Sequence, residues 1–527
     1  MSFDVINWFA ALVPILVLLI LLLRFRWGGD EAASVGLLFA IAVAYFMFGG
    51  SIDMIASAVA KAMWTSVSII YIVFPALIIY EVSRESGAFI AIREGMQKFT
   101  PDKVLQVLAV GWIFNGFLQG ITGFGVPVVV CAPLLVGMGV KPMTAVIISL
   151  LGQAWGNTFG TLGIAWDGLV SQADLSDPVT YYQTIIWTTV MLGIVNLIAG
   201  LAIAGLAGGK QGLKRNTLTV VFLGVLQGAG QLAIALVNTM LCNFIVVSIS
   251  LVVIFAIGKL KYYSKPVELF DATVDLKGDK LDNSNVMSIQ QAFIPYAFLI
   301  VTAVVVLLNS TIKGFLGQVK FSLAFVSKST GLGFATAAYS NYAPLAPFIH
   351  SGSFLLIAAV IGYYCYSSKG YIKAGGWKTI VKNAMGKTVP SAIAVVGLVA
   401  MSKVMDDTGQ TAVLAKGVAA ATGGFYPVLS PFIGLLGTFM TASNLSSNIL
   451  FSNFQQQVAQ MLNIDKAPLL AAQTVGGSIG SVLSPSKILL GTSAVGILGR
   501  EGEVIGKILG GSLAVCAVFG LVILLSY

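Results

Sequence analysis

The chain has 527 residues, of which 57% are hydrophobic and 10% charged, and its formal net charge is +9. Such an apolar composition excludes an ordinary soluble domain and favours a bundle of membrane-spanning helices. Because the cytoplasmic loops of membrane proteins are rich in Lys and Arg, the positive charge indicates membrane topology and not a nucleic-acid partner.

Apolar runs long enough to cross a bilayer recur along the chain. They cover 5 to 23, 32 to 49, 64 to 80, 181 to 207, 216 to 237, 239 to 257, 292 to 308, 352 to 366, 389 to 402 and 504 to 526. The sequence therefore predicts an all-α polytopic membrane protein with about 11 to 13 spans. The first run is followed by Arg24 and lacks a small-residue cleavage site, so a retained helix is expected in place of a signal peptide.

The distribution of basic residues predicts how the chain is threaded. With the N-terminus outside, 22 of the 30 Lys and Arg fall on the inside, seven fall outside, and Lys487 falls within a span. The segments assigned to the inside are Lys141 and the loops 24 to 31, 81 to 103, 208 to 216, 258 to 290, 367 to 388 and 497 to 507. The longest polar break, 258 to 290, is predicted to be a cytoplasmic linker between a first membrane half, 1 to 257, and a second, 291 to 527. The stretch 309 to 350 is predicted to be a long, lid-like connection.

A glycine-rich and polar stretch, 119 to 163, interrupts the apolar pattern of the first half. Lipid cannot hydrogen-bond freed backbone groups, so an irregular backbone at membrane depth must be buried in protein or line a watery cavity. The stretch predicts a re-entrant hairpin over 104 to 140 and a broken helix over 142 to 165. A bound polar ligand is expected between them.

The second half repeats this arrangement. It predicts a hairpin over 425 to 462, followed by a broken helix over 467 to 497. The hairpin tips at Thr122 and Ser443 are 321 residues apart, and Gln153 is 320 residues from Gln473. Internal repeats of this kind are often inverted in transporters, and the seven spans assigned between the two hairpins predict two inverted-topology repeats.

The candidate binding residues lie at the hairpin tips and in the helices that follow them. Broken helices expose N-terminal NH groups that attract a carboxylate, and freed carbonyl groups can hold a cation. The predicted substrate-binding residues are Gln119, Thr122, Gly123, Phe124, Gly125, Gln153 and Asn157 in the first half, with Thr158 and Thr161 beside them. In the second half they are Ser443, Asn444, Ser446, Ser447, Asn448, Gln473, Ser478, Ser481 and Lys487, with Thr441 and Ser484.

Close helix packing is the alternative explanation for these residues. Small residues let membrane helices approach one another, and their hydroxyl groups bond to neighbours. Packing does not require Asn, Gln and Pro at two matching places, so the sequence favours a binding role for the pair of breaks.

Lys487 is the most distinctive single residue of the second break. A charge inside a membrane is costly and usually faces a cavity or a partner, so the lysine is predicted to face a substrate carboxylate. The alternative is that its long stem reaches an interface. No acidic residue is predicted in the middle of a span, and a structural role is favoured for His350, the only histidine.

Other classes of protein find little support in the sequence. Cys131, Cys242, Cys365 and Cys516 lie in apolar segments without a CxxC pair, so neither a metal site nor a disulfide framework is expected. Since motifs of zinc proteases, nucleotide-binding proteins and serine hydrolases are not found, the chain is not expected to be an enzyme or to need a cofactor. An anion channel could use the same breaks as a filter, and it stays as the rival interpretation.

Three strings resemble the lactate permease family of bacterial monocarboxylate transporters. They are GFLQGITGFGVPVVVCAPLLVGMGVKP at 116 to 142, GTFMTASNLSSNILFSNFQ at 437 to 455 and GGSIGSVLSPSKILLGTSAVGILGREGE at 476 to 503. The resemblance implies a secondary transporter that takes up L-lactate, glycolate or a related 2-hydroxy acid, usually together with protons. It also implies kinship with ion transporters that have paired re-entrant hairpins, and a location in the bacterial inner membrane.

Three residues depart from the family pattern. Gln119 stands where the family commonly has Glu, Asn444 where it commonly has Asp, and Lys487 where an uncharged residue is more usual. An amide cannot release a proton at physiological pH. The expected partners are therefore a small organic anion, either H⁺ or Na⁺ as coupling cation, and the bilayer; uncoupled transport and a homodimer stay open.

Overall fold

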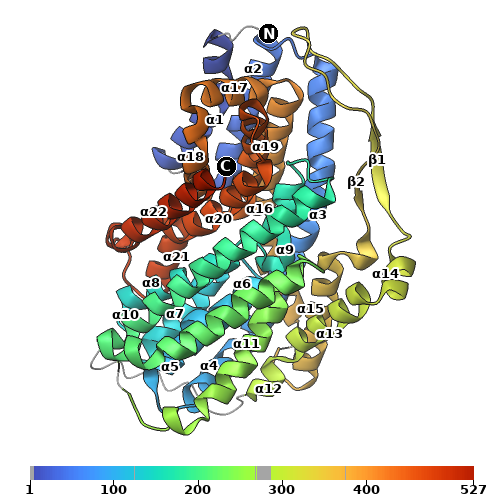
Figure 1. Cartoon of the computed structure of the whole chain (residues 1–527). Coiled ribbons are helices and arrows are strands. Elements are labelled where there is room, and N and C mark those ends of the chain that lie inside the picture. The colour runs from blue at the N-terminus through green and yellow to red at the C-terminus, as the bar shows by residue number, and fades with distance from the viewer. Residues whose placement is uncertain (1–4, 26, 124, 268, 270–286, 374) are drawn as a thin grey trace.

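The fold is a bundle of helices with one small sheet on its side (Figure 1). The computed structural model describes residues 5–25, 27–123, 125–267, 269, 287–373 and 375–527. The first half contains α1 (Val5–Leu23), α2 (Gly29–Phe46), α3 (Ile52–Glu85), α4 (Ala88–Lys98), α5 (Lys103–Leu108), the π-helical segment η1 (Ala109–Phe114), α6 (Asn115–Ile121), α7 (Val126–Gly137), α8 (Pro142–Gln153), the 3₁₀ turn η2 (Ala154–Gly156), α9 (Gly160–Val170), α10 (Pro178–Ala235), α11 (Cys242–Gly258) and η3 (Lys261–Tyr263).

The second half contains two strands as well as helices. It contains α12 (Ile289–Ala292), α13 (Ile294–Leu308), α14 (Ser310–Leu316), β1 (Phe321–Phe325), β2 (Tyr339–Leu345), η5 (Pro347–Ile349), α15 (Ser351–Ser368), α16 (Gly376–Asp407), α17 (Gln410–Thr422), η6 (Gly423–Phe425), α18 (Tyr426–Thr441), α19 (Asn444–Leu462), α20 (Lys466–Leu483), α21 (Pro485–Ala494) and α22 (Glu501–Leu525). Most of the predicted linker 258 to 290 lies outside the described residues.

The helices confirm the prediction of a polytopic membrane protein. Among the described residues, nine helices are long and apolar enough to cross a membrane, or ten if α13 and α14 together form one span. This count is lower than the predicted 11 to 13 spans. Three further apolar helices, Val126–Gly137, Pro142–Gly156 and Cys242–Gly258, are shorter than a full span, and α10 joins two predicted spans.

Helix α10 replaces the predicted loop 208 to 216 by a sharp break at one residue. Gly209 has φ 57° and ψ −153°, a conformation open to glycine because it has no Cβ. The two arms fold back on each other, and Asn196 Nδ2 donates to Gln227 Oε1 at 2.7 Å. Trp112 Nε1 donates to Asn196 Oδ1 at 2.6 Å, so the paired arms are fixed to the π-helical segment η1.

The prediction of an entirely helical fold is wrong at one place. Strands β1 and β2 form an antiparallel pair within the predicted lid-like stretch and lie beside α3 on the outside of the bundle (Figure 1). Trp64 Nε1 donates to the carbonyl oxygens of Tyr342 at 3.2 Å and Ala343 at 3.0 Å. The pair is exposed over much of its length, so it shows no strong alternation of polar and apolar residues in the sequence.

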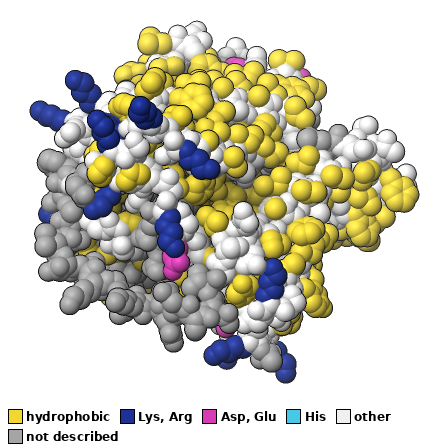
Figure 2. Space-filling model, turned by 90° about the horizontal axis from the view of Figure 1, so that it is seen from below, with side chains coloured by type: hydrophobic (Ala, Val, Ile, Leu, Met, Phe, Trp, Pro, Cys, Tyr) yellow, Lys and Arg dark blue, Asp and Glu magenta, His cyan; other side chains and the backbone are white. Residues whose placement is uncertain are grey.

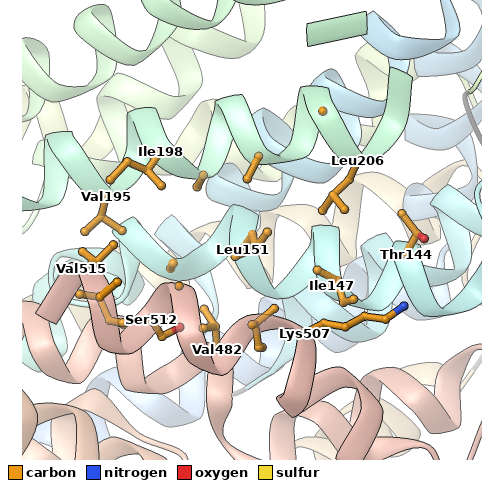
Figure 3. A pocket seen from close by; sticks show the side chains of 18 residues that line it. Thr144, Ile147, Leu151, Val195, Ile198, Leu206, Val482, Lys507, Ser512 and Val515 are labelled. Carbon is orange, nitrogen blue, oxygen red and sulfur yellow. The ribbon is translucent and has the colours of Figure 1, made fainter. Parts of the chain in front are cut away.

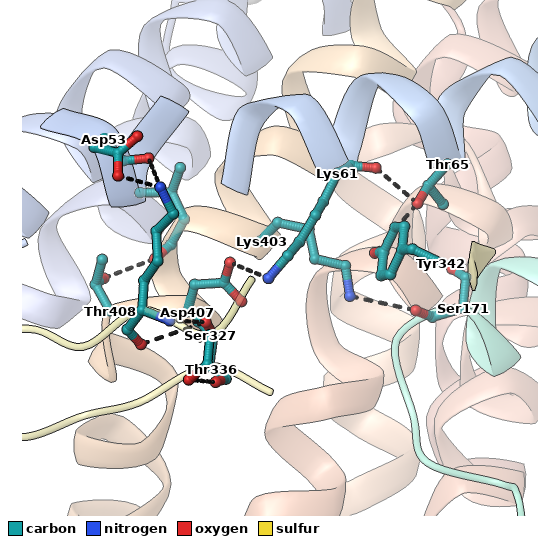
Figure 4. Close-up of polar contacts among 12 residues, drawn as sticks. Asp53, Lys61, Thr65, Ser171, Ser327, Thr336, Tyr342, Lys403, Asp407 and Thr408 are labelled. Carbon is teal, nitrogen blue, oxygen red and sulfur yellow. Dashed lines mark hydrogen bonds and ion pairs between the residues drawn. The ribbon is translucent and has the colours of Figure 1, made fainter. Parts of the chain in front are cut away.

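A buried ion pair lies under this strand pair (Figure 4). Lys61 Nζ and Asp407 Oδ2 are 3.0 Å apart, and their side chains are 3% and 11% exposed. The ammonium also lies 5.6 Å from the ring centroid of Tyr339 and 5.8 Å from that of Phe325, a distance that permits a cation–π interaction. Helices α3 and α16 are thereby joined to the strands.

The core of the bundle lies around the predicted first hairpin. The segment Lys103–Ile121 is 94% buried, whereas the corresponding figures for α1 and α22 are 17% and 33%. The end of the molecule where α4, α5 and α12 lie displays many Lys and Arg side chains and few acidic ones (Figure 2).

Candidate functional site

The first break lies between α8 and the regular part of α9. Helix α8 passes through η2 into a turn at 157–159, and Thr161, Leu162 and Gly163 then have φ angles of 50°, 52° and 81°. These left-handed conformations free backbone groups from the regular helical pattern. The tip of the preceding hairpin is fixed to the break, because the Gly123 NH donates to Thr161 Oγ1 at 2.7 Å.

The second break lies at Ser484, between α20 and α21. Ser484 has φ −60° and ψ 122°, and Pro485 has no NH with which to continue the helix. The tip between α18 and α19 turns at Ala442, whose φ is 59°, and the Ser443 hydroxyl caps α19 by accepting from the Ser446 NH.

The two breaks differ in one respect that the sequence comparison did not predict. Gln153 ends α8 at the first break, whereas Gln473 lies inside the continuous helix α20. The glycines near Gln473 serve close packing: a Cβ at Gly476 would lie 1.9 Å from the Pro431 carbonyl oxygen, and one at Gly480 would lie 2.3 Å from that of Leu435. For these glycines the packing alternative holds.

Asn157 forms the centre of a buried polar junction. Its side-chain oxygen accepts hydrogen bonds from three of the predicted residues: Gln119 Nε2 lies 3.2 Å from it, Ser481 Oγ 3.2 Å and Lys487 Nζ 3.3 Å. Its side-chain nitrogen donates to the Gln153 carbonyl at 2.9 Å. The first hairpin, the first break, α20 and α21 therefore meet at one amide group, which we call the Asn157 junction.

Lys487 lies inside the protein. The whole residue is 4% exposed. Its ammonium group also donates to Ser481 Oγ. Within the described part of the chain, no Asp or Glu oxygen lies within 4.0 Å of this ammonium. A buried cation without an anionic partner is costly, so the junction has the electrostatic character of an anion site.

A second junction joins the tip of the second hairpin to the first break. Asn444 Nδ2 lies 3.2 Å from both Thr158 Oγ1 and Ser478 Oγ, and those two hydroxyl oxygens are 2.8 Å apart. Asn448 Nδ2 donates to Thr474 Oγ1 at 2.9 Å. Thr474 was not predicted individually, because a threonine in an apolar helix is usually bonded to its own backbone.

The two junctions are adjacent. Asn157 and Thr158 are neighbours in sequence, and Ser478 and Ser481 are three residues apart on one face of α20. Several buried amide oxygens nearby have no hydrogen-bond partner among the described residues, including those of Gln119, Asn444 and Asn448. Such oxygens can accept a hydrogen bond from a ligand or coordinate a cation.

The other predicted residues lie close by in different roles. Ser447 accepts from Gln473 Nε2 at 3.0 Å, and Gln473 accepts from Gln455 at 3.1 Å, so these residues form a separate network. Thr122 bonds to its own helix. Gly125, with φ 82°, begins α7 beside α21, since a Cβ there would lie 2.7 Å from Leu490 Cδ1. Phe124 lies outside the described residues.

His350 and Glu81 make structural contacts away from the two junctions. His350 caps α15 by accepting from the Gly352 NH at 3.2 Å, and its other ring nitrogen lies 2.9 Å from Ser68 Oγ. Glu81 is paired with Arg84 at 2.8 Å and Lys387 at 2.6 Å. Among the described residues, no three His, Cys, Asp or Glu side chains are grouped as metal ligands.

The helices and the two buried junctions define the class of the molecule: a multi-pass membrane protein with a polar interior at two helix breaks. The chain belongs to the L-lactate permease family, because a sequence model of that family, described as L-lactate permease, matches residues 7–527. The family resemblance of the three strings is thereby confirmed. Membership, together with the apolar helices, makes the protein a multi-pass transport protein of the plasma membrane.

Individual relatives agree with this assignment. The chain is 27% identical to an L-lactate permease of Halalkalibacterium halodurans, with 94% of this chain and 92% of that protein covered. It is 28% identical to an L-lactate permease of Escherichia coli, with the same coverage, and 26% identical to the glycolate permease of that organism, with 98% and 94% covered. Among solved structures, the YdaH transporter of Alcanivorax borkumensis matches with a TM-score of 0.39 and 14% identity over 86% of this chain and 84% of that one.

Proposed function

We propose that this protein is a secondary transporter of a small organic anion, with L-lactate or a related 2-hydroxy monocarboxylate such as glycolate as its substrate. The observation that carries the proposal is the buried Lys487 ammonium, which has no carboxylate partner among the described residues and lies 3.3 Å from Asn157 Oδ1. The named activities of the relatives, L-lactate and glycolate permeases, support this choice of substrate.

The substrate carboxylate binds at the Asn157 junction in this proposal. It accepts hydrogen bonds from Lys487 Nζ and Ser481 Oγ, replacing their bonds to Asn157. The 2-hydroxyl group then donates to an amide oxygen, either Asn157 Oδ1 or the unpartnered Gln119 Oε1. A charged acceptor makes stronger hydrogen bonds than a neutral amide. Lys487 therefore binds the substrate anion in preference to the Asn157 side chain.

Transport follows alternating access between the two halves. The proposed halves are 1–257 and 291–527, joined by a cytoplasmic linker at 258–290, with the hairpins 104–140 and 425–462 inverted relative to each other. The protein lies in the inner membrane of a bacterium, with its N-terminus on the outer side of that membrane. Contacts between the halves at both junctions, such as Thr158 with Ser478, support a site shared between them.

The transport is proposed to be coupled to a cation, with the proton implied by the family. Sodium is the second candidate, because the unpartnered amide oxygens of Gln119, Asn444 and Asn448 are neutral ligands of the kind that can hold a cation at a helix break. Neither Gln119 nor Asn444 can itself carry a proton.

Purified protein in liposomes tests the function. Labelled L-lactate should exchange against internal unlabelled L-lactate, and an imposed proton or sodium gradient, applied separately, should drive accumulation. No saturable exchange of L-lactate or glycolate would refute the transporter. Conductance far above carrier turnover in a planar bilayer, without stimulation by substrate on the opposite side, would favour an anion channel instead.

A further inference from the structure

An apolar groove of about 930 Å³ opens on the side of the bundle between α10 and α22 (Figure 3). Its inner wall is formed by α8, η2 and α20. Ile198 on its rim is 44% exposed, and Leu509 and Leu513 on α22 are each 38% exposed. These side chains face the surroundings of a membrane protein, so the groove is accessible to lipid.

One end of the groove is basic. Among the described residues that line the groove, Lys507 is the only charged one, and its side chain extends toward Thr144. Leu206 lies at the same end (Figure 3). This end corresponds to the start of α8, the start of α22 and the end of the first arm of α10, which were all assigned to the cytoplasmic side.

A second cavity adjoins this end. It shares Gly205 with the groove and is lined by Lys210 and Gln211 at the break of α10. Neither Lys210 nor Lys507 has an Asp or Glu oxygen within 4.0 Å in the described part of the chain. An apolar slot that has, at one end, two ammonium groups without a salt bridge among the described residues matches an amphiphile that has acyl chains and an anionic head.

We propose that this groove binds an anionic glycerophospholipid of the cytoplasmic leaflet. The acyl chains lie between α10 and α22, and the phosphate lies at the end formed by Lys507 and Lys210. Zwitterionic lipids fill the apolar part but gain less from the two lysines, so the site selects lipids by net charge.

The groove lies against helices that also form the candidate site. Leu151 and Ala154 in its wall precede Asn157 on the first broken helix, and Ile479 and Val482 adjoin Ser478 and Ser481 on α20. A bound acyl chain therefore packs against the backs of both helices that meet at the Asn157 junction. Lipid binding in this groove is independent of the substrate that the junction takes.

Lipid binding to the purified full-length protein tests the proposal. Native mass spectrometry would compare retention of dioleoyl phosphatidylglycerol and dioleoyl phosphatidylcholine by wild type, K210Q, K507Q and the double variant. We expect phosphatidylglycerol to be preferred, and each lysine substitution to weaken its binding about five-fold. The matched control is Lys378→Gln, which removes an exposed lysine of α16 assigned to the same side and should leave retention unchanged.

A second pair of variants tests the apolar part. Gly511 lines the groove, and a Cβ there would meet no atom within 4 Å, as is also the case for Gly506, which lies outside it. Gly511→Phe should fill the groove and reduce retention of phosphatidylglycerol, whereas Gly506→Phe should not. Equal retention of both lipids, or wild-type retention by K210Q/K507Q, would overturn the proposal. A dimer that Gly511→Phe dissociates, without lipid retained by wild type, would assign the groove to a second copy.

Discussion

Lys487 Nζ lies 3.3 Å from Asn157 Oδ1, although 330 residues separate them in the sequence. The contact joins the helix after the second break to the turn at the first break. Because Gln119 and Ser481 donate to the same oxygen, one amide group holds together a hairpin tip and both broken helices. A ligand that takes over the Lys487 contact would replace one of these three hydrogen bonds.

A carboxylate at position 157 should compete with substrate for the lysine. In Asn157→Asp, the new carboxylate pairs with the Lys487 ammonium, so a substrate anion has to displace a charged partner in place of a neutral one. We expect the KM for L-lactate exchange to rise about ten-fold or more, in line with the cost of disrupting a buried charge pair. Asn216→Asp, which changes a buried amide of α10 that donates to the Gly212 carbonyl, is the control; an equal rise in both variants would contradict the specific role of position 157.

An acid at position 444 should change the driving force. Asn444 Nδ2 is surrounded by the hydroxyl groups of Thr158, Thr474 and Ser478, which can donate to a carboxylate as well as accept from an amide. In Asn444→Asp, a group that binds and releases a proton is introduced at the second junction. Uptake in liposomes should then respond more steeply to an imposed pH gradient than uptake by wild type. An unchanged response at equal exchange activity would show that this position does not take part in coupling.

Close contact between α18 and α20 should depend on Gly476. A methyl group there would lie 1.9 Å from the Pro431 carbonyl oxygen, which cannot move without shifting the helix. We expect Gly476→Ala to lower the free energy of unfolding by about 1 to 3 kcal/mol, the usual cost of overpacking, with a lower Tm in detergent. Gly424→Ala, where a Cβ meets nothing within 4 Å, should leave Tm nearly unchanged. Equal Tm values for the two variants would contradict this packing.

The ion pair under the strands should show strong coupling between its partners. Lys61→Met leaves the Asp407 carboxylate buried without its cation, which typically costs about 3 to 5 kcal/mol. Removing both charges in K61M/D407N should cost less than the sum of the two single variants, because no unpaired charge remains. A double-mutant cycle on thermal stability measures this coupling; additive effects would place the pair in solvent.

The sequence was sufficient to predict the helical class and several of the residues that meet at the site. Glycine and amide residues inside apolar runs pointed to Gln119 and Asn157, which the structure brings into contact. The sequence could not show whether Lys487 faces a substrate or reaches an interface. Its place after Pro485 indicates its position along the chain but not which side chains surround it. In the structure the residue is buried beside Ser481, and its contact with a substrate carboxylate stays a prediction.

Other features depend on packing that no local pattern specifies. Gln473 looked equivalent to Gln153, yet its helix continues because Gly476 and Gly480 fit against the backbone of α18. The break of α10 depends on a single glycine, Gly209, within a glycine-rich stretch where several positions would serve equally well. Likewise, β1 and β2 are held by contacts from α3, such as that of Trp64, and not by their own alternation.

The affinity of purified protein for L-lactate, measured by isothermal titration calorimetry with wild type and Lys487→Gln, tests the central claim most directly. The variant should fold with an unchanged or higher Tm, since a costly buried charge is removed, and should bind L-lactate at least about 30-fold more weakly because a hydrogen-bonded charge pair with the substrate is lost. Lys403→Gln, which replaces another buried lysine, should keep wild-type affinity. Wild-type affinity in Lys487→Gln would contradict the assignment of Lys487 to the substrate carboxylate.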